Sequence, residues 1–246
     1  MDNHIRLEHG SGGVLSRELV EDVIFPRLKS VSYPSLSDAT EIAGVERMCM
    51  TTDTFVVDPI FFPGGDIGKL AVYGTCNDLA VSGARPKYLS LGFVIEEGFP
   101  VIDLKRLVDS ITEAAGSAGV AVVTGDTKVV PEGRGGGIYI NSCGIGEKVY
   151  PSTLGAPGIK AGDAVVLSGP IGAHGMAILA MRESLPVGKN LLSDCANLFP
   201  LCSDLYDLGQ DLRVMRDATR GGVAAVLNEL VSELSFGILV KWAGLV

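Results

Sequence analysis

The stretch TTDTFVVDPIFFPGGDIGKLA, residues 51–71, decides the fold of the first half of this 246-residue chain. Its first part belongs to a run rich in β-branched residues that predicts a strand over residues 45–57, with Asp53 near its middle or at a bend. The sequence FFPGGD predicts a turn over residues 61–66, and the residues after it predict a helix over 67–82. A strand, a tight turn and a helix therefore follow one another directly.

Strands and helices continue on both sides of this unit. Apolar residues at the spacing of one helix face predict a helix over 14–28. After the central unit, apolar patterns and glycine positions predict a strand over 88–95, a helix over 101–118, and strands over 120–123 and 137–146. Because the last two strands are adjacent in sequence, the pattern favours an α+β fold over a regular βαβ winding.

A Pro- and Gly-rich stretch, PSTLGAPGIKAGD at residues 151–163, predicts the boundary between a domain over 1–150 and a domain over 151–246. The second domain is expected to contain strands over 164–167 and 237–242, helices over 174–184 and 223–234, and a helical region over 191–208 that Pro200 interrupts. A domain seldom ends on a strand with nothing after it. We therefore expect the second domain to be incomplete at Val246.

Composition restricts the classes of protein and partner. The formal net charge of −9 argues against a nucleic-acid or anionic-membrane partner, because either needs a basic surface. The five cysteines form no CxxC pair or Cys/His cluster, which argues against a disulfide framework and a structural zinc site. No signal-peptide core opens the chain, and every apolar run is shorter than the ~18 residues of a membrane span. We therefore expect a cytoplasmic protein.

Five aspartates at predicted strand ends or turns stand beside small residues: Asp38, Asp53, Asp78, Asp126 and Asp217. Mg²⁺ prefers oxygen ligands and usually shares them with phosphates, and small neighbours let a polyphosphate approach the backbone. Taken one at a time, each aspartate is more typical of a helix cap or a turn. Spacing alone does not show whether the five converge, so both interpretations stay open.

Two further kinds of group suit phosphate. The HGSGG sequence, His9–Gly13, offers backbone N–H groups ahead of a predicted helix, although a flexible leader with a helix cap explains it equally well. Lys128 directly follows Gly125-Asp126-Thr127, and Arg220 stands close to Asp217. Either cation could neutralise phosphate charge during transfer, but the commoner role of such a cation is an ion pair with the neighbouring aspartate.

The segments HGSGG, TTDTFVVDPIFFPGGDIGKLA, NDLAVSGARPKYLS, TGDTKVV and RDATRGG, in this order, resemble those of the HypE family of hydrogenase maturation factors. That family belongs to the superfamily of aminoimidazole ribonucleotide (AIR) synthetase, selenophosphate synthetase and thiamine monophosphate kinase. The resemblance covers essentially the whole chain and implies a two-domain, PurM-like (AIR synthase-like) α+β fold. It also implies that the N-terminal sheets of two subunits pair in a homodimer and that ATP binds between the domains.

The resemblance also assigns roles to residues of this sequence. It implies that Asp38, Asp53, Asp78, Asp126 and Asp217 are the Mg²⁺- and phosphate-site carboxylates. The implied nucleotide-binding residues are His9, Gly10, Ser11, Gly12, Gly13, Asp53, Gly125, Asp126, Thr127 and Arg220. Lys128 and Asp78 are the implied catalytic residues, with Lys128 as the cation beside the reacting group.

The implied reaction is the ATP-driven dehydration of a thiocarboxamide on the protein's C-terminal cysteine to a thiocyanate. The implied partners are the carbamoyltransferase HypF, which delivers the carbamoyl group, and the HypC–HypD scaffold, which receives the cyano group for a [NiFe] hydrogenase. The family ends on the reacting cysteine, whereas this sequence ends at Trp242–Val246, so we expect the chain to lack a C-terminal portion. Two alternatives stay open: another ATP-dependent synthetase or kinase of the superfamily, and a non-catalytic nucleotide-binding scaffold.

Overall fold

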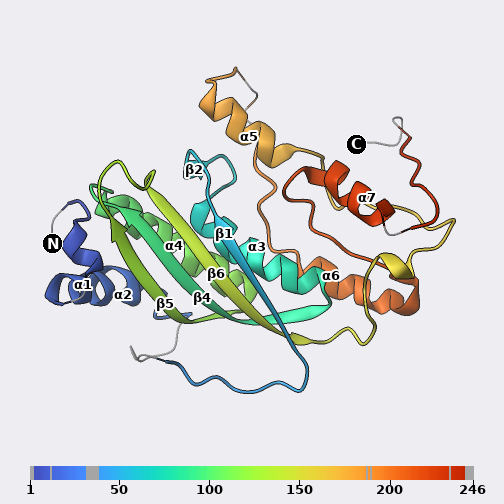
Figure 1. Cartoon of the computed structure of the whole chain (residues 1–246), viewed down its shortest axis with the longest axis horizontal. Helices are drawn as coiled ribbons and strands as arrows, with labels where there is room; N and C mark the ends of the chain where they lie inside the picture. The colour runs from blue at the N-terminus through green and yellow to red at the C-terminus, as the bar shows by residue number, and fades with distance from the viewer. Residues whose placement is uncertain are drawn as a thin grey trace.

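The computed structural model describes residues 3–11, 13–31, 39–186, 188, 190–232 and 234–241. Its centre is a four-stranded sheet in the order β1-β6-β4-β5, in which β4 and β5 are parallel and the other neighbours are antiparallel (Figure 1). The strands are β1 (Met48–Phe55), β4 (Ala84–Glu96), β5 (Ala121–Val130) and β6 (Ile138–Lys148). A small hairpin of β2 (Phe61–Phe62) and β3 (Gly65–Asp66) forms the predicted turn over 61–66.

Two helices, α3 (Ile67–Val81) and α4 (Val101–Ala118), pack behind the sheet in Figure 1 and confirm the two helices predicted there. The Asp66 carboxylate accepts a hydrogen bond from the Lys69 N–H and so caps the start of α3. All residues of α3 are described and none is exposed, because the sheet, α4 and the second half of the chain surround this helix. α4 buries one apolar stripe that includes Leu104, Leu107, Val108 and Ile111.

β5 is longer than the sequence predicts. The sequence predicts a strand over 120–123, but β5 continues through Gly125-Asp126-Thr127 and Lys128. Parallel pairing with β4 holds these residues in the strand. Gly125 permits this pairing, since a Cβ atom at this position would lie 2.6 Å from the Leu91 carbonyl oxygen. Asp126 and Lys128 therefore project from an edge strand of the sheet.

α3 and α4 leave the second face of the sheet open in the described part of the chain (Figure 1). Met48 and Met50 on β1 are 62% and 67% exposed. The register places Met50, Ile145 and Tyr88 in one row across three strands of this face. An apolar row on an open sheet face is typical of an interaction surface. It agrees with the pairing of two N-terminal sheets, which stays a prediction.

The helix predicted over 14–28 is present as three successive segments: α1 (Val14–Glu18), the π-helical η2 (Leu19–Ile24) and α2 (Phe25–Leu28). Leu19 and Val23 are buried against the core that the sheet and α4 form. The short η1 (Leu7–Gly10) precedes them and contacts β5. The N-terminal segments therefore lie beside the β5 edge of the sheet. None of the helices built from described residues combines the length and the apolarity needed to cross a bilayer.

The second half of the described chain contains η3 (Ala156–Gly158), α5 (Ala173–Arg182), α6 (Phe199–Leu205), η4 (Tyr206–Asp211) and α7 (Gly222–Ser232). Pro200 stands in the first turn of α6, where a missing N–H costs no hydrogen bond, so it begins a helix and does not interrupt one. The strands predicted over 164–167 and 237–242 are wrong for the described residues, which form no strand there. A strand needs a hydrogen-bonded neighbour, and none of the described residues pairs with either segment.

Candidate functional site

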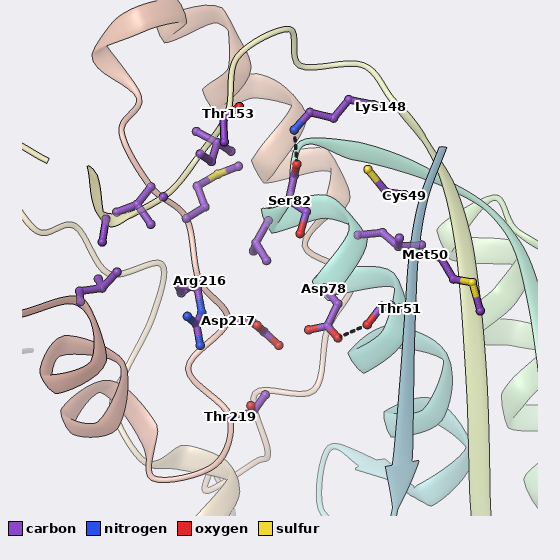
Figure 2. Close-up of a pocket in the computed structure, with 18 of the residues that line it drawn as sticks. Cys49, Met50, Thr51, Asp78, Ser82, Lys148, Thr153, Arg216, Asp217 and Thr219 are labelled. Atoms are coloured by element: carbon purple, nitrogen blue, oxygen red, sulfur yellow. Dashed lines mark hydrogen bonds between the residues drawn. The ribbon is translucent and has the colours of Figure 1, made fainter. Parts of the chain in front are cut away.

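A cavity of about 760 Å³ lies between the first half of the chain and the second (Figure 2). One wall consists of residues from β1 and from the C-terminal half of α3, among them Asp53 and Asp78. The opposite wall comes from the loops around Leu154 and Met215 and includes Asp217. Charged groups from both halves of the chain therefore face one space.

Three of the five predicted carboxylates lie in this cavity. Asp53 is on β1, where the alternation of side chains puts it on the same face as Thr51, toward α3. Asp78 is in the last turns of α3, and the Thr51 hydroxyl donates a hydrogen bond of 2.8 Å to its Oδ2 atom. Asp217 lies on the loop before α7 and points across the cavity toward Asp78 in Figure 2. The fold thus brings together carboxylates that are far apart in sequence.

Burial and mutual repulsion raise the pKa of two of these carboxyl groups. Burial is the larger cause at Asp217, followed by the negative charge of Asp78, and the pKa of Asp217 is raised to about 6. The pKa of Asp53 is also raised, first by burial and then by Asp78, while the charge of Arg220 opposes the shift. Burial and the nearby charge of Asp78 therefore both disfavour the ionised form of these two carboxyl groups.

These residues fit a Mg²⁺ ion shared with a polyphosphate better than a metal held by protein alone. Among the described residues, no three His, Cys, Asp or Glu side chains approach closely enough to enclose a metal ion. Mg²⁺ usually takes one or two carboxylates and completes its shell with water and phosphate oxygens. A divalent cation would also offset the repulsion from Asp78, which adds to the effect of burial in raising the pKa of Asp53 and Asp217. Asp38, another predicted ligand, lies outside the described residues.

Lys128 and the residues before it lie at the opposite edge of the sheet. The Lys128 ammonium donates a hydrogen bond of 3.5 Å to the Gly10 carbonyl oxygen, because η1 packs on β5. Asp126 is exposed on the same strand, and its Oδ1 atom accepts a hydrogen bond of 2.8 Å from the Thr127 N–H. The GDTK sequence and the start of the HGSGG segment therefore come together, as a second group that is separate from the cavity.

The HGSGG segment makes its own internal contacts. His9 is buried, and its Nδ1 atom accepts a hydrogen bond of 2.8 Å from the Arg6 N–H, which closes the turn of η1. The Ser11 hydroxyl donates to the Glu8 carbonyl oxygen over 3.2 Å. Gly13 follows with a φ of +83°, and Gly12 lies outside the described residues. These contacts give the His9 and Ser11 side chains structural partners, and phosphate binding by this segment stays a prediction.

Two strands separate the cavity from the second group. β1 and β5 are the outer strands of the sheet, so Asp53 and Asp126 are about 14 Å apart at the usual strand spacing. The register aligns Asp53 with Gly125 across the sheet, so Asp126, the next residue, projects from the opposite face. One chain therefore does not bring Asp126 and Lys128 to the cavity.

Comparisons with known proteins identify the family. Residues 37–147 match the N-terminal domain of AIR synthase related proteins, and residues 160–243 match their C-terminal domain. Over 243 residues the chain is 43% identical to the carbamoyl dehydratase HypE of Cupriavidus necator, which covers 98% of this chain and 69% of that relative. The chain belongs to the HypE family.

Solved HypE structures have the same fold. A crystal structure of HypE in complex with ATP has a TM-score of 0.86 and 43% identity, over 92% of this chain and 67% of that chain. The structure of a HypE–HypF complex has a TM-score of 0.73 and 51% identity, over 75% of this chain and 61% of that chain. These likenesses confirm the AIR synthase-like α+β fold. They also class the chain with the carbamoyl dehydratases of hydrogenase maturation.

The two domains of the HypE family meet at the cavity. Asp53 and Asp78 lie within the N-terminal match, whereas Asp217 and Arg220 lie within the C-terminal match. The boundary predicted at residues 150 and 151 stays a prediction. The chain spans about 69% of the length of the Cupriavidus necator relative. The incompleteness of the second domain and the dimer also stay predictions.

Two of the cavity residues that sequence reasoning missed form hydrogen bonds near the C-terminal end of α3: Thr51 and Lys148. Thr51 stands two residues before Asp53, and strand alternation would have placed both on one face. Lys148 donates to the Ser82 carbonyl oxygen at the end of α3, and burial lowers its pKa. No local motif marks Lys148, because only the pairing of β6 with β4 brings it to the end of α3.

Proposed function

We propose that this chain binds Mg·ATP in the cavity between its two domains and uses it to dehydrate a cysteine thiocarboxamide to a thiocyanate. The observation that carries the proposal is the convergence of Asp53, Asp78 and Asp217 from both domains on one cavity. These carboxylates would hold Mg²⁺. Arg220 lines the same cavity near Asp53, within reach of a phosphate. The crystal structure of a HypE relative with ATP supports nucleotide binding by this chain.

The chemistry requires the amide oxygen to become a good leaving group. Transfer of the γ-phosphoryl group to the thiocarboxamide oxygen breaks the bond to ADP and forms a C–O–P linkage. Loss of the phosphate, which takes the C–O electron pair, and of the amide protons then leaves the C≡N bond of the thiocyanate. When bound, Mg²⁺ offsets negative charge on the transferring phosphate. We assign the Lys128 ammonium to the same developing charge.

A second copy of the chain is the source we assign for Lys128 and Asp126. Both residues lie on the β5 edge, away from the cavity of their own chain. In a two-fold dimer the same surface of each copy meets the other, and the open sheet face with Met50 and Ile145 offers such a surface. A two-fold axis parallel to the strands puts the β5 edge of one copy beside the β1 edge of its partner. The partner would then complete each cavity.

Two protein partners extend the proposal. HypF would deliver the carbamoyl group, and the crystal structure of a HypE–HypF complex among the relatives supports this assignment. The HypC–HypD scaffold would receive the cyano group, as the resemblance to the HypE family implies. Both partners must reach a cysteine sulfur that also enters the ATP cavity, so the thiocarboxamide has to move between two sites.

The nucleotide site is tested by calorimetric titration of the wild type and Asp78→Asn with ATP, with and without Mg²⁺. We expect Mg-dependent binding that the substitution weakens, and an unchanged affinity would remove the metal assignment. The reaction is followed by mass spectrometry of the full-length carbamoylated protein, whose mass should fall by one water when Mg·ATP is added. Phosphate transfer to thiamine monophosphate would instead support the kinase alternative.

A further inference from the structure

Residues 192–198, which we call the strap, lead into α6 and form hydrogen bonds with α3. The strap runs from the side of α5 along α3 to α6 (Figure 1). Near its start, the Ser193 N–H donates a hydrogen bond of 2.8 Å to the Pro63 carbonyl oxygen in the β2–β3 hairpin. A Cβ atom at Gly64 would lie 2.8 Å from the Ser193 backbone, so hairpin and strap are in direct contact. The strap is therefore seated on the first domain.

Asn77 of α3 holds the other end of the strap with two hydrogen bonds of opposite sense. Its Nδ2 atom donates to the Ala196 carbonyl oxygen over 3.0 Å. Its Oδ1 atom accepts from the Leu198 N–H over 2.9 Å. The side-chain amide uses both its donor and its acceptor on the backbone of one short segment. This pair of bonds fixes the position of the strap along α3.

α3 binds the strap on one face and lines the cavity on the neighbouring face. Ala80 and Val81, three and four residues after Asn77, pack in the buried cluster with α6. Asp78 and Ser82, which are four residues apart, line the cavity. Asn77, which binds the strap, is thus adjacent in sequence to Asp78, which faces the cavity. Both lie on a helix that has no exposed residue.

The chain beyond the strap leads to the opposite wall of the cavity. Cys202 of α6 is buried in the cluster with Val81, and Met215 packs against the same cluster. Asp217 follows two residues later and faces the cavity. The Tyr206 hydroxyl also donates a hydrogen bond of 2.6 Å to the Ala80 carbonyl oxygen. The position of Asp217 therefore depends on how α6 is seated against α3.

We propose that Asn77 is a positioning residue that sets the separation of Asp78 and Asp217 by fixing the strap on α3. The inference rests on the proposed nucleotide site, but Asn77 itself does not line the cavity. Without its amide, the Cys202 cluster and the Tyr206 hydrogen bond still hold α6 against α3, but the strap loses its fixed position along the helix, so the Asp217 loop shifts relative to Asp78. The separation of Asp78 and Asp217 then varies in the free protein. Mg·ATP binds more weakly, because part of the binding free energy is used to order the site.

Two substitutions and one matched control test this role. Asn77→Ala removes both hydrogen bonds. Asn77→Asp keeps the acceptor for the Leu198 N–H, but it replaces the donor by a carboxylate oxygen that faces and repels the Ala196 carbonyl oxygen. The control Asn197→Ala also removes two hydrogen bonds, the one of 3.2 Å to the Ser117 carbonyl oxygen of α4 and the one of 3.1 Å that its Oδ1 atom accepts from the Phe199 N–H. It leaves both hydrogen bonds between the strap and Asn77 of α3 intact. Circular dichroism confirms that each variant is folded.

Two readouts separate positioning from stability. The first is Mg·ATP affinity by calorimetry, and the second is the distance distribution between bio-orthogonal spin labels at two exposed sites, Ile102 on α4 and Asn228 on α7. We expect one narrow distance in the wild type and in Asn197→Ala. Both Asn77 variants should show a broadened or shifted distribution together with a loss of affinity of about tenfold, which corresponds to about 1.4 kcal/mol.

Each remaining outcome decides the question. A narrow, unchanged distance in Asn77→Ala overturns the proposal, and so does a broadened distance with unchanged affinity. If the wild type itself binds no ATP, the proposed function fails, and the distance distributions alone then support or reject the role of Asn77. If Asn77→Ala does not fold, Asn77→Asp, which keeps one of the two bonds, provides the same comparison.

Discussion

The hydroxyl of Thr51 on β1 donates a hydrogen bond of 2.8 Å to the Oδ2 atom of Asp78 on α3. The bond joins an edge strand of the sheet to the helix that packs behind it, at the wall of the cavity. It fixes the orientation of one carboxylate before any ligand binds, which is the condition for a well-defined metal or phosphate site.

Replacing Thr51 with valine removes this donor and keeps the shape of the side chain. We expect the affinity for Mg·ATP to fall about fivefold, because a hydrogen bond of this kind has a net worth of about 1 kcal/mol. Calorimetry measures the change. Thr52→Val is the matched control, since the Thr52 hydroxyl donates to the Ser142 carbonyl oxygen and does not line the cavity. Equal losses in both variants would point to the strand as a whole and not to the bond with Asp78.

Mixed dimers test whether Lys128 acts on the cavity of a partner copy. Neither Lys128→Ala nor Asp78→Asn alone should turn over ATP. When the two variants are unfolded together and refolded, half of the dimers carry one intact composite site, so about a quarter of the wild-type activity should return. If Lys128 served the cavity of its own chain, every site would contain one defect and the mixture would stay inactive.

The raised pKa of Asp217 predicts how stability depends on pH. Its pKa rises from 3.8 to about 6 on folding. Between these values the unfolded chain has released the proton and the native protein still holds it, so the free energy of unfolding falls as pH rises. Asp217→Asn removes this contribution. The wild type should therefore lose stability relative to the variant between pH 3.8 and about 6, as urea unfolding measures. A difference that does not change over this range would contradict the raised pKa.

Glu96 at the end of β4 predicts the opposite pH dependence. Its carboxylate accepts hydrogen bonds from the backbone N–H groups of Gly137, Gly136 and Gly133, and these bonds lower its pKa below the ordinary value of 4.5. Such a group stabilises the native state above pH 4.5, and the contribution is lost as pH falls through the lowered pKa. Glu96→Gln should therefore cost stability at neutral pH and little in strong acid. Glu132→Gln is the control, because Glu132 is exposed and lies in the loop that contains Gly133 and Gly136. A loss of equal size in this variant would argue against the Glu96 carboxylate contacts.

Local patterns predicted the elements that their own residues determine. The apolar stripe of α4 fixed both of its ends, because helix periodicity and Gly119 are visible within the segment itself. The full length of β5 was not predictable, since only the neighbouring β4 keeps Gly125 in the strand. The strand predicted over 164–167 is absent for the related reason that it has no described partner.

The candidate site shows the same limit more clearly. Spacing left the roles of the aspartates open, and only the resemblance to the HypE family named them together. That Asp53, Asp78 and Asp217 converge while Asp126 lies across the sheet is a property of the strand order β1-β6-β4-β5. Strand order is set by long-range pairing, which no stretch of sequence contains by itself.

Because α3 has no exposed residue, its tolerance of substitution should differ from that of α4. α4 has an outer side, on which Ile102 is 71% exposed, and a saturation library should show accepted and rejected positions alternating along it with the helical period. α3 is in contact with the sheet, with α4, with α6 and with the cavity at once. A side chain at almost any position of this helix therefore contacts a neighbouring element, so we expect α3 to accept fewer substitutions than α4 during evolution.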